Sequence, residues 1–152
     1  CTVFAQAQYV APSEGVFRII NVGYNAALME DFLGHTLHCT ANIGDNNDYE
    51  QLWILKTSGS GYSLQNLFTG AYIQTGNTGT EVNYWTGSTA KTFNIVAAGN
   101  GNAYNIWDPT LGAQGLHSKA ANGNVVRRVD CDPSRWRLVK VELTEHEIEA
   151  ER

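Results

Sequence analysis

Three short segments of the chain share one pattern, in which apolar and polar residues alternate behind a leading aromatic residue. They occupy residues 17–21, 62–66 and 104–108, so the leading aromatics stand 45 and 42 residues apart. Alternation with a period of two is typical of a β-strand that is buried on one face. A second landmark recurs in step with the first and centres on Trp53, Phe93 and Trp136. Two landmarks that keep the same phase indicate three in-phase repeats of about 40–45 residues.

Short clusters of glycine and asparagine separate these segments, as at residues 59–61, 76–79, 99–102 and 122–123. Asn-Gly and Gly-Asn pairs supply the positive φ angles that tight hairpins need. Between residue 15 and residue 141 no stretch shows the 3.6-residue periodicity of an amphipathic helix. The sequence therefore predicts an all-β chain with about four strands in each repeat.

This strand count predicts a β-trefoil, a barrel of three repeats that hairpins close at one end. A β-propeller needs at least four blades, and an immunoglobulin sandwich has no three-fold repeat. The 152 residues are enough for one domain with a substantial core. We divide the chain into an N-terminal extension (1–14), the trefoil (15–141) and an acidic tail (142–152). The trefoil units span about 15–60, 61–101 and 102–141.

Large aromatic residues at equivalent places in the three units are expected to pack together, because they dominate the burial of apolar area in cores. The predicted core includes Phe17, Trp53, Tyr62, Phe93, Tyr104 and Trp136. Gln51 is expected to tie a strand to a neighbouring loop through its side-chain amide. These residues define the fold and do not indicate what the protein binds.

Residues 51–53 (Gln-Leu-Trp), with degenerate echoes at 91–93 and 134–136, resemble the Q-x-W signature of ricin-B-type β-trefoil lectins. The opening at residues 15–22 (GVFRIINV) is similar to the start of small fungal members of that family. The resemblance covers roughly residues 15–141 and implies a β-trefoil. Two other groups of fungal trefoils are also similar: cysteine-protease inhibitors of mushrooms and the lectin-like light subunit of mushroom tyrosinase.

The resemblance implies sugar recognition by a carboxylate, a stacking aromatic and an amide side chain in each unit, a combination that suits polar rings with one apolar face. In unit one, Glu30 and Asp31 fall near the carboxylate position, and Asn46 and Asn47 precede the Q-x-W segment. The stacking position there holds Thr40 or Ala41.

Unit two has aromatic residues but lacks the carboxylate. Its candidate residues for carbohydrate binding are Tyr72, Asn77, Asn83 and Trp85. Tyr84 and Trp85 are adjacent on a predicted strand, so one of the two side chains faces outward. Unit three holds Asp108, Gln114, His117 and Asn122 but has no aromatic residue at the stacking position.

These observations favour a non-enzymatic, lectin-like carbohydrate-binding protein of fungal type with one or two weak sugar sites. The alternative is a protein-interaction subunit or inhibitor that uses the trefoil surface, as a partner of an oxidase such as tyrosinase or of a protease. Retained asparagine-rich loops favour the lectin, whereas missing stacking residues favour the alternative. Both interpretations leave room for a homo- or hetero-oligomer.

Other function classes lack their sequence signals. No G-x-S-x-G elbow or phosphate-binding glycine loop is present, so no catalytic residue, cofactor or metal site is predicted. The tail carries most of the net charge of −5, and the rest of the chain shows no basic face for nucleic acid. No apolar run is long enough to insert into a membrane. Three cysteines and no visible signal peptide predict free thiols and a cytoplasmic location.

Overall fold

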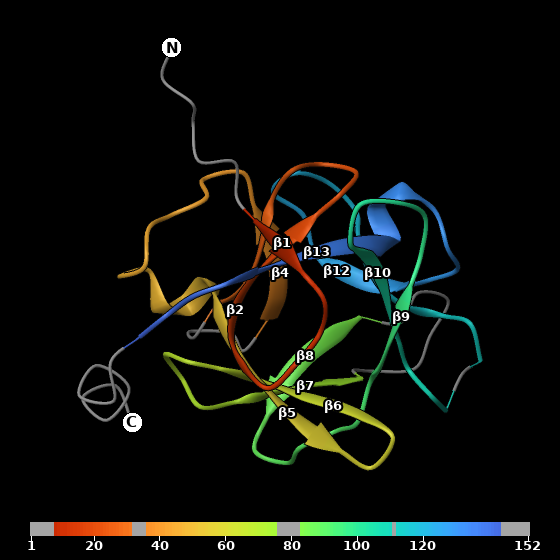
Figure 1. The fold of residues 1–152 in the computed structure, drawn as a ribbon, viewed down its shortest axis with the longest axis horizontal. Helices are drawn as coiled ribbons and strands as arrows, with labels where there is room; N and C mark the ends of the chain where they lie inside the picture. Colours follow the sequence, from red (N-terminus) through yellow and green to blue (C-terminus); the bar gives the residue numbers. More distant parts are fainter. Residues whose placement is uncertain (1–7, 32–35, 76–82, 111, 144–152) are drawn as a thin grey trace.

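The computed structural model describes residues 8–31, 36–75, 83–110 and 112–143, and within them every regular element except two short 3-10 helices is a strand (Figure 1). The first unit contains β2 (Gly15–Asn21), β3 (Ala27–Asp31), β4 (Thr36–Thr40), η1 (Tyr49–Gln51) and β5 (Leu52–Ser58). The second contains β6 (Gly61–Asn66), β7 (Tyr72–Thr75), β8 (Tyr84–Gly87) and β9 (Asn94–Ala97). The third contains β10 (Ala103–Trp107), β11 (Gly115–Ser118), β12 (Val125–Arg128), η2 (Asp132–Ser134) and β13 (Arg135–Lys140).

The first and last strands of the three units form a closed barrel. β2 pairs with β5 and β13, β5 with β6, and β10 with β9 and β13. A single bridge from Tyr62 to Phe93 joins β6 to the segment that leads into β9, which closes the ring. The two middle strands of each unit, β3–β4, β7–β8 and β11–β12, form hairpins.

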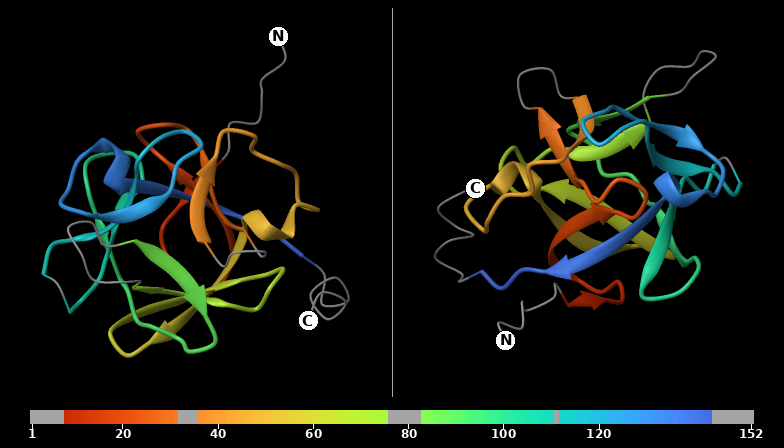
Figure 2. Two further views of the ribbon diagram at one scale, coloured as in Figure 1. Left: turned by 180° about the vertical axis from the view of Figure 1, so that it is seen from behind. Right: turned by 90° about the horizontal axis from the view of Figure 1, so that it is seen from above.

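The three hairpins meet one another at one end of the barrel (Figure 2). Thr36 pairs with Trp85, Asn83 with Val126, and His38 with Asn124, so each hairpin contacts the other two. This arrangement of three four-stranded units is the predicted β-trefoil.

The aromatic residues of the Q-x-W positions lie in the shared core, as predicted. Trp53, Phe93 and Trp136 are all fully buried. The indole Nε1 of Trp53 donates to the Leu28 carbonyl at 2.9 Å, and that of Trp136 donates to the Leu116 carbonyl at 3.0 Å. These bonds satisfy the polar atom of each buried indole, so both rings can fill the barrel without a desolvation penalty.

The prediction for Tyr104 is wrong in part. Phe17 is fully buried and Tyr62 packs against the core, but Tyr104 is only half-buried and its hydroxyl donates to Asn102 at 3.3 Å near the surface. Ile106 contributes to the core from the same strand instead. The phenol keeps its hydroxyl near water, and the apolar residue two positions further along the same face is buried in its place.

Gln51 ties its strand to the preceding loop, which confirms the predicted role of the side-chain amide. Its Oε1 accepts the backbone N–H of Gly44 at 3.0 Å, and its Nε2 donates to the Asn42 carbonyl at 3.0 Å. The side chain is 5% exposed, so both of these hydrogen bonds are shielded from water.

The domain extends beyond the predicted limits at both ends. β1 (Tyr9–Val10) pairs with β13, and Val10 packs against the core, so the boundary at residue 15 leaves out a strand of the sheet. Two residues are too few to show alternation in a sequence. At the other end, Leu143 packs against a second apolar cluster that contains Val16 and Val141. No helix among the described residues is long and apolar enough to cross a membrane.

Candidate functional site

The outward face of the β7–β8 hairpin carries the exposed aromatic residue predicted for unit two. Along β8, Tyr84 and Thr86 are buried, whereas Trp85 between them is 45% exposed. Ile73 on β7 points into the core in the same way. Strict alternation therefore turns the indole of Trp85 toward solvent and the phenol of Tyr84 inward.

Gln74 lies directly opposite Trp85 in the antiparallel register, so the two side chains share one face of the hairpin. The Nε2 of Gln74 donates to the Thr89 carbonyl, which fixes the amide along the strand. A β-carbon at Gly87 would meet the Oε1 of Gln74 at 2.6 Å. Glycine at this position therefore leaves room for the Gln74 amide in this orientation.

The other predicted residues of unit two flank this pair. Tyr72 is half-buried two residues before Gln74 and pairs with Gly87. Asn83 is exposed, and it pairs with Val126 of the third unit. The predicted residue Asn77 lies outside the described residues. The predicted site residues did not include Gln74. Its position opposite Trp85 in the pairing of the two hairpin strands is the signal that could have identified it.

A shallow cleft of about 360 Å³ lies at the open end of the same hairpin. It is lined by Thr69, Gly70, Ala71, Thr86, Gly87 and Ser88. The cleft adjoins the hairpin where Tyr72 pairs with Gly87. Its volume lies at the lower end of the range of small-molecule sites.

Glu30 requires correction as a predicted sugar-contacting carboxylate, because its side chain is fully buried. One carboxylate oxygen accepts the Thr86 hydroxyl at 2.5 Å, and the other accepts the hydroxyl of Thr69. The carboxylate therefore joins the first unit to the second below the cleft. Glu30 and Thr86 are 56 residues apart, so no local pattern in the sequence indicates this contact.

The remaining unit-one candidates come from the end of β3 and from the loop that follows β4. Asp31 ends β3 opposite Thr36, and its side chain lies outside the described residues. Asn46 and Asn47 are exposed in the loop between β4 and η1. That loop is held from the barrel side, where Arg18 donates to the Asp45 carbonyl at 2.5 Å.

Buried charge lies behind the hairpin in the seam between the second and third units. Asp108 is fully buried and accepts the Thr75 hydroxyl at 2.5 Å. Burial alone would raise the pKa of Asp108, but hydrogen bonds from Thr75 and Thr110 and the charge of Lys91 lower it overall. Burial raises the pKa of Tyr84, and the negative charge of Asp108 adds to that shift. Asp108 is thus a structural carboxylate rather than one presented to a ligand.

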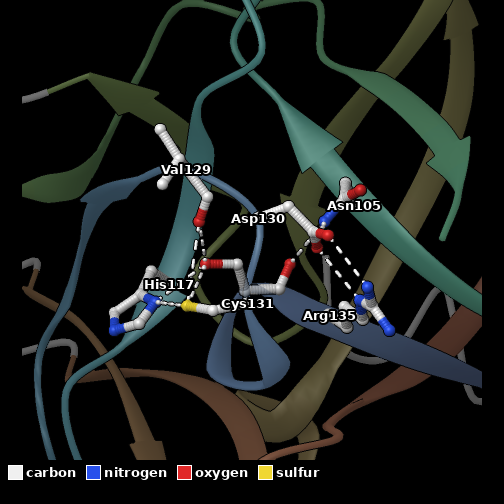
Figure 3. A network of polar contacts seen from close by, with 7 residues as sticks. Asn105, His117, Val129, Asp130, Cys131 and Arg135 are labelled. Carbon is white, nitrogen blue, oxygen red and sulfur yellow. Dashed lines mark hydrogen bonds and ion pairs between the residues drawn. The ribbon is translucent and has the colours of Figure 1, made fainter. Parts of the chain in front are cut away.

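The third unit brings together residues that sequence reasoning treated separately. His117 on β11 and Cys131 before η2 approach within 3.5 Å (Figure 3). Val126 is buried at the cross-strand position opposite His117, so no aromatic residue lies there. Among the described residues, no group of three or more His, Cys, Asp or Glu side chains could hold a metal ion.

Neither a protein-family model nor a curated protein sequence matches this chain. Solved structures do match. An agglutinin from Rhizoctonia solani is 23% identical, with a TM-score of 0.73 over 87% of this chain and 99% of its own. A ricin B-like lectin from Macrolepiota procera, solved in complex with lactose, is 15% identical, with a TM-score of 0.74 over 87% and 100%. The BEL β-trefoil is 17% identical, with a TM-score of 0.63 over 90% and 100%.

These matches confirm the β-trefoil and the resemblance to fungal ricin B-like lectins at the level of the fold. Each match covers nearly the whole of the other chain, so the likeness extends over the complete three-unit architecture. The suggested link to the tyrosinase light subunit stays a prediction.

Proposed function

We propose that this protein is a non-enzymatic, lectin-like carbohydrate-binding protein whose principal site is the outward face of the β7–β8 hairpin. The observation that carries the proposal is the side-by-side placement of Trp85 and Gln74. An indole that is 45% exposed provides a flat apolar surface, and the neighbouring amide provides a directed polar group. The fold shared with sugar-binding lectins supports this assignment.

Sugar rings suit this surface because one of their faces is apolar and their edges carry hydroxyl groups. Stacking on Trp85 would bury the apolar face, while Gln74 and Asn83 would meet the hydroxyls at the edge. The adjoining cleft of about 360 Å³ offers room for a further part of a glycan.

Affinity at this site should be weak. The carboxylate expected in unit one is buried, and the amide of Gln74 already donates to the Thr89 carbonyl, so few polar anchors remain for a well-hydrated ligand. We therefore expect a dissociation constant of roughly 10⁻³ to 10⁻⁵ M for a single glycan.

A glycan array at high protein concentration identifies the ligand, and titration with lactose is the first quantitative probe. Binding should be followed by isothermal titration calorimetry, which reports equally on the native protein and on a variant that lacks the Trp85 indole. Trp85→Ala should weaken binding at least tenfold without lowering the melting temperature. An exposed ring contributes little to the core, whereas loss of stacking removes most of the apolar contact.

Tyr24→Ala is the matched control, since Tyr24 is 40% exposed on the turn between β2 and β3 and should not affect binding. Equal binding by the native protein and Trp85→Ala would show that the sugar site lies elsewhere. A blank array, together with capture of a stoichiometric enzyme from the source tissue, would instead support the protein-interaction alternative.

A further inference from the structure

The loop that leads into the last barrel strand presents a cysteine beside a histidine. Cys131 is exposed, and its Sγ lies 3.5 Å from the Nδ1 of His117 and 3.5 Å from the Oγ of Ser134 (Figure 3). His117 comes from β11, in the hairpin, whereas Cys131 immediately precedes the short helix η2 and Ser134 is its last residue. The thiol is therefore accessible and is held against an imidazole from another element.

The hydrogen bonds around Ser134 determine which ring nitrogen of His117 carries a proton. The Ser134 hydroxyl donates to the Val129 carbonyl at 2.8 Å, because a carbonyl can only accept. Its oxygen must then accept the bond of 2.8 Å from His117, so Nδ1 carries the hydrogen. The same Nδ1 lies 2.8 Å from the serine oxygen and 3.5 Å from the Cys131 sulfur. A donor in this position stabilises negative charge on the sulfur, the form of a cysteine that attacks other sulfur atoms.

A second set of contacts fixes the loop that carries the thiol. Arg135 donates two hydrogen bonds to the carboxylate of Asp130, at 3.0 and 2.9 Å, and Asn105 donates to the same carboxylate at 2.9 Å. Arg135 also adds a positive charge that interacts electrostatically with Cys131. Bidentate pairing of this kind restricts the geometry as well as adding energy. Cys131 is thus held in place beside His117 by residues on both sides.

Cys39 differs from Cys131 in every respect that matters for reactivity. It is fully buried, and burial raises the pKa of its thiol to about 12. A buried, protonated thiol does not react with solutes in the folded protein. Cys39 thus serves as an unreactive thiol in the same chain, with which the reactivity of Cys131 can be compared.

We propose that Cys131 is a site of reversible S-thiolation by low-molecular-weight aliphatic disulfides, with His117 as the group that positions and activates the thiol. The Cys131 thiolate attacks one sulfur of the disulfide, forming a mixed disulfide and releasing the other half as a thiolate, which takes up the proton that Cys131 lost. One disulfide bond breaks as another forms, so no other oxidant is needed. A small thiol reverses the reaction. The site lies on the third unit and is independent of the proposed sugar site.

Oxidised glutathione is the probe, applied to the folded 152-residue chain in which Cys1→Ser removes the thiol of Cys1. Intact-mass spectrometry follows the adduct, and peptide mapping locates it. We expect one glutathionyl group, at Cys131, and Cys39 should react only after denaturation. The Cys131→Ser variant in the same background should acquire no adduct while folded. Modification of Cys39 at a comparable rate, or no adduct on the folded protein, would overturn the proposal.

Two substitutions of His117 test the role of the imidazole. His117→Leu removes the donor beside the sulfur and should slow the reaction about threefold. His117→Asn places an amide N–H near the position of Nδ1 and should retain the rate within about twofold. Unreactive Cys39 verifies that each variant is folded. Equal rates for the native chain and His117→Leu would refute the role of His117, and so would equal slowing in both variants.

Discussion

Asp108→Asn replaces one buried oxygen by nitrogen and so tests how much a buried charge contributes to this trefoil. Asn21 and Asn66 occupy the equivalent positions in units one and two, and all three side chains are fully buried. In each unit the side-chain oxygen accepts a backbone N–H of the following turn, at 3.0 Å for Asn21, 3.0 Å for Asn66 and 3.1 Å for Asp108. Asparagine therefore fits this turn, and the substitution isolates the charge.

The magnitude follows from the groups that the charge binds. Asp108 accepts hydroxyl donors from Thr75 at 2.5 Å and Thr110 at 2.7 Å, and Lys91 lies 3.3 Å away with a side chain that is 24% exposed. Neutral asparagine keeps the turn contact but loses the ion pair and weakens the two charge-assisted bonds. We expect a loss of about 2 kcal/mol in the free energy of unfolding. For a chain of this length that lowers the melting temperature by about 4–8 °C.

Urea unfolding of both proteins between pH 7 and pH 3 measures the effect and its pH dependence. The pKa of Asp108 is lowered in the folded state relative to its usual value of 3.8. A lowered pKa means that the charge stabilises the fold above pH 3.8, and that this contribution is lost as the pH falls through the folded-state value. The difference between the two proteins should therefore be constant near neutral pH and shrink below about pH 4.

Asp130→Asn is the matched control. Hydrogen bonds from Arg135 and Asn105 lower the pKa of Asp130 to about 2, but its side chain is 41% exposed and solvent screens the pair with Arg135. The same chemical change should cost less than about 1 kcal/mol there. An equal loss at both positions, or a difference for Asp108→Asn that persists unchanged at pH 3, would refute the reasoning about burial.

Two further substitutions test the packing of the barrel. Trp53→Phe should lower the free energy of unfolding by about 2–3 kcal/mol in urea titrations, because it leaves a cavity and removes the donor to the Leu28 carbonyl. Phe93 shows that a phenyl ring fits an equivalent position. No change would mean that the indole is not part of the core. Val10→Ser should cost about 1 kcal/mol in the same urea titrations, because Val10 packs against the core from β1. Val129→Ser, at a position that is 61% exposed, should cost less than about 0.5 kcal/mol. Equal effects would show that β1 does not stabilise the domain.

The sequence alone was sufficient to predict the architecture, because the alternating strand segments and the aromatic landmarks both recur three times in the same phase. Alternation located the strands that begin near Phe17, Tyr62 and Tyr104, and the in-phase landmarks placed Trp53, Phe93 and Trp136 in one core. Adjacent residues on a strand face opposite ways, so the outward turn of either Tyr84 or Trp85 also followed from the sequence. Local periodicity carries this information directly.

Contacts between residues far apart in the sequence were decided only by the tertiary structure. Glu30 resembles a ligand-binding carboxylate in the sequence, yet Thr86, 56 residues away, covers it in the seam between two units. Cys131 and His117 meet because the loop before β13 folds back over the third hairpin, and β1 belongs to the sheet although two residues show no pattern. Alternation states only that a side chain points inward or outward. Which distant residue it then meets depends on how the three units close around their common axis.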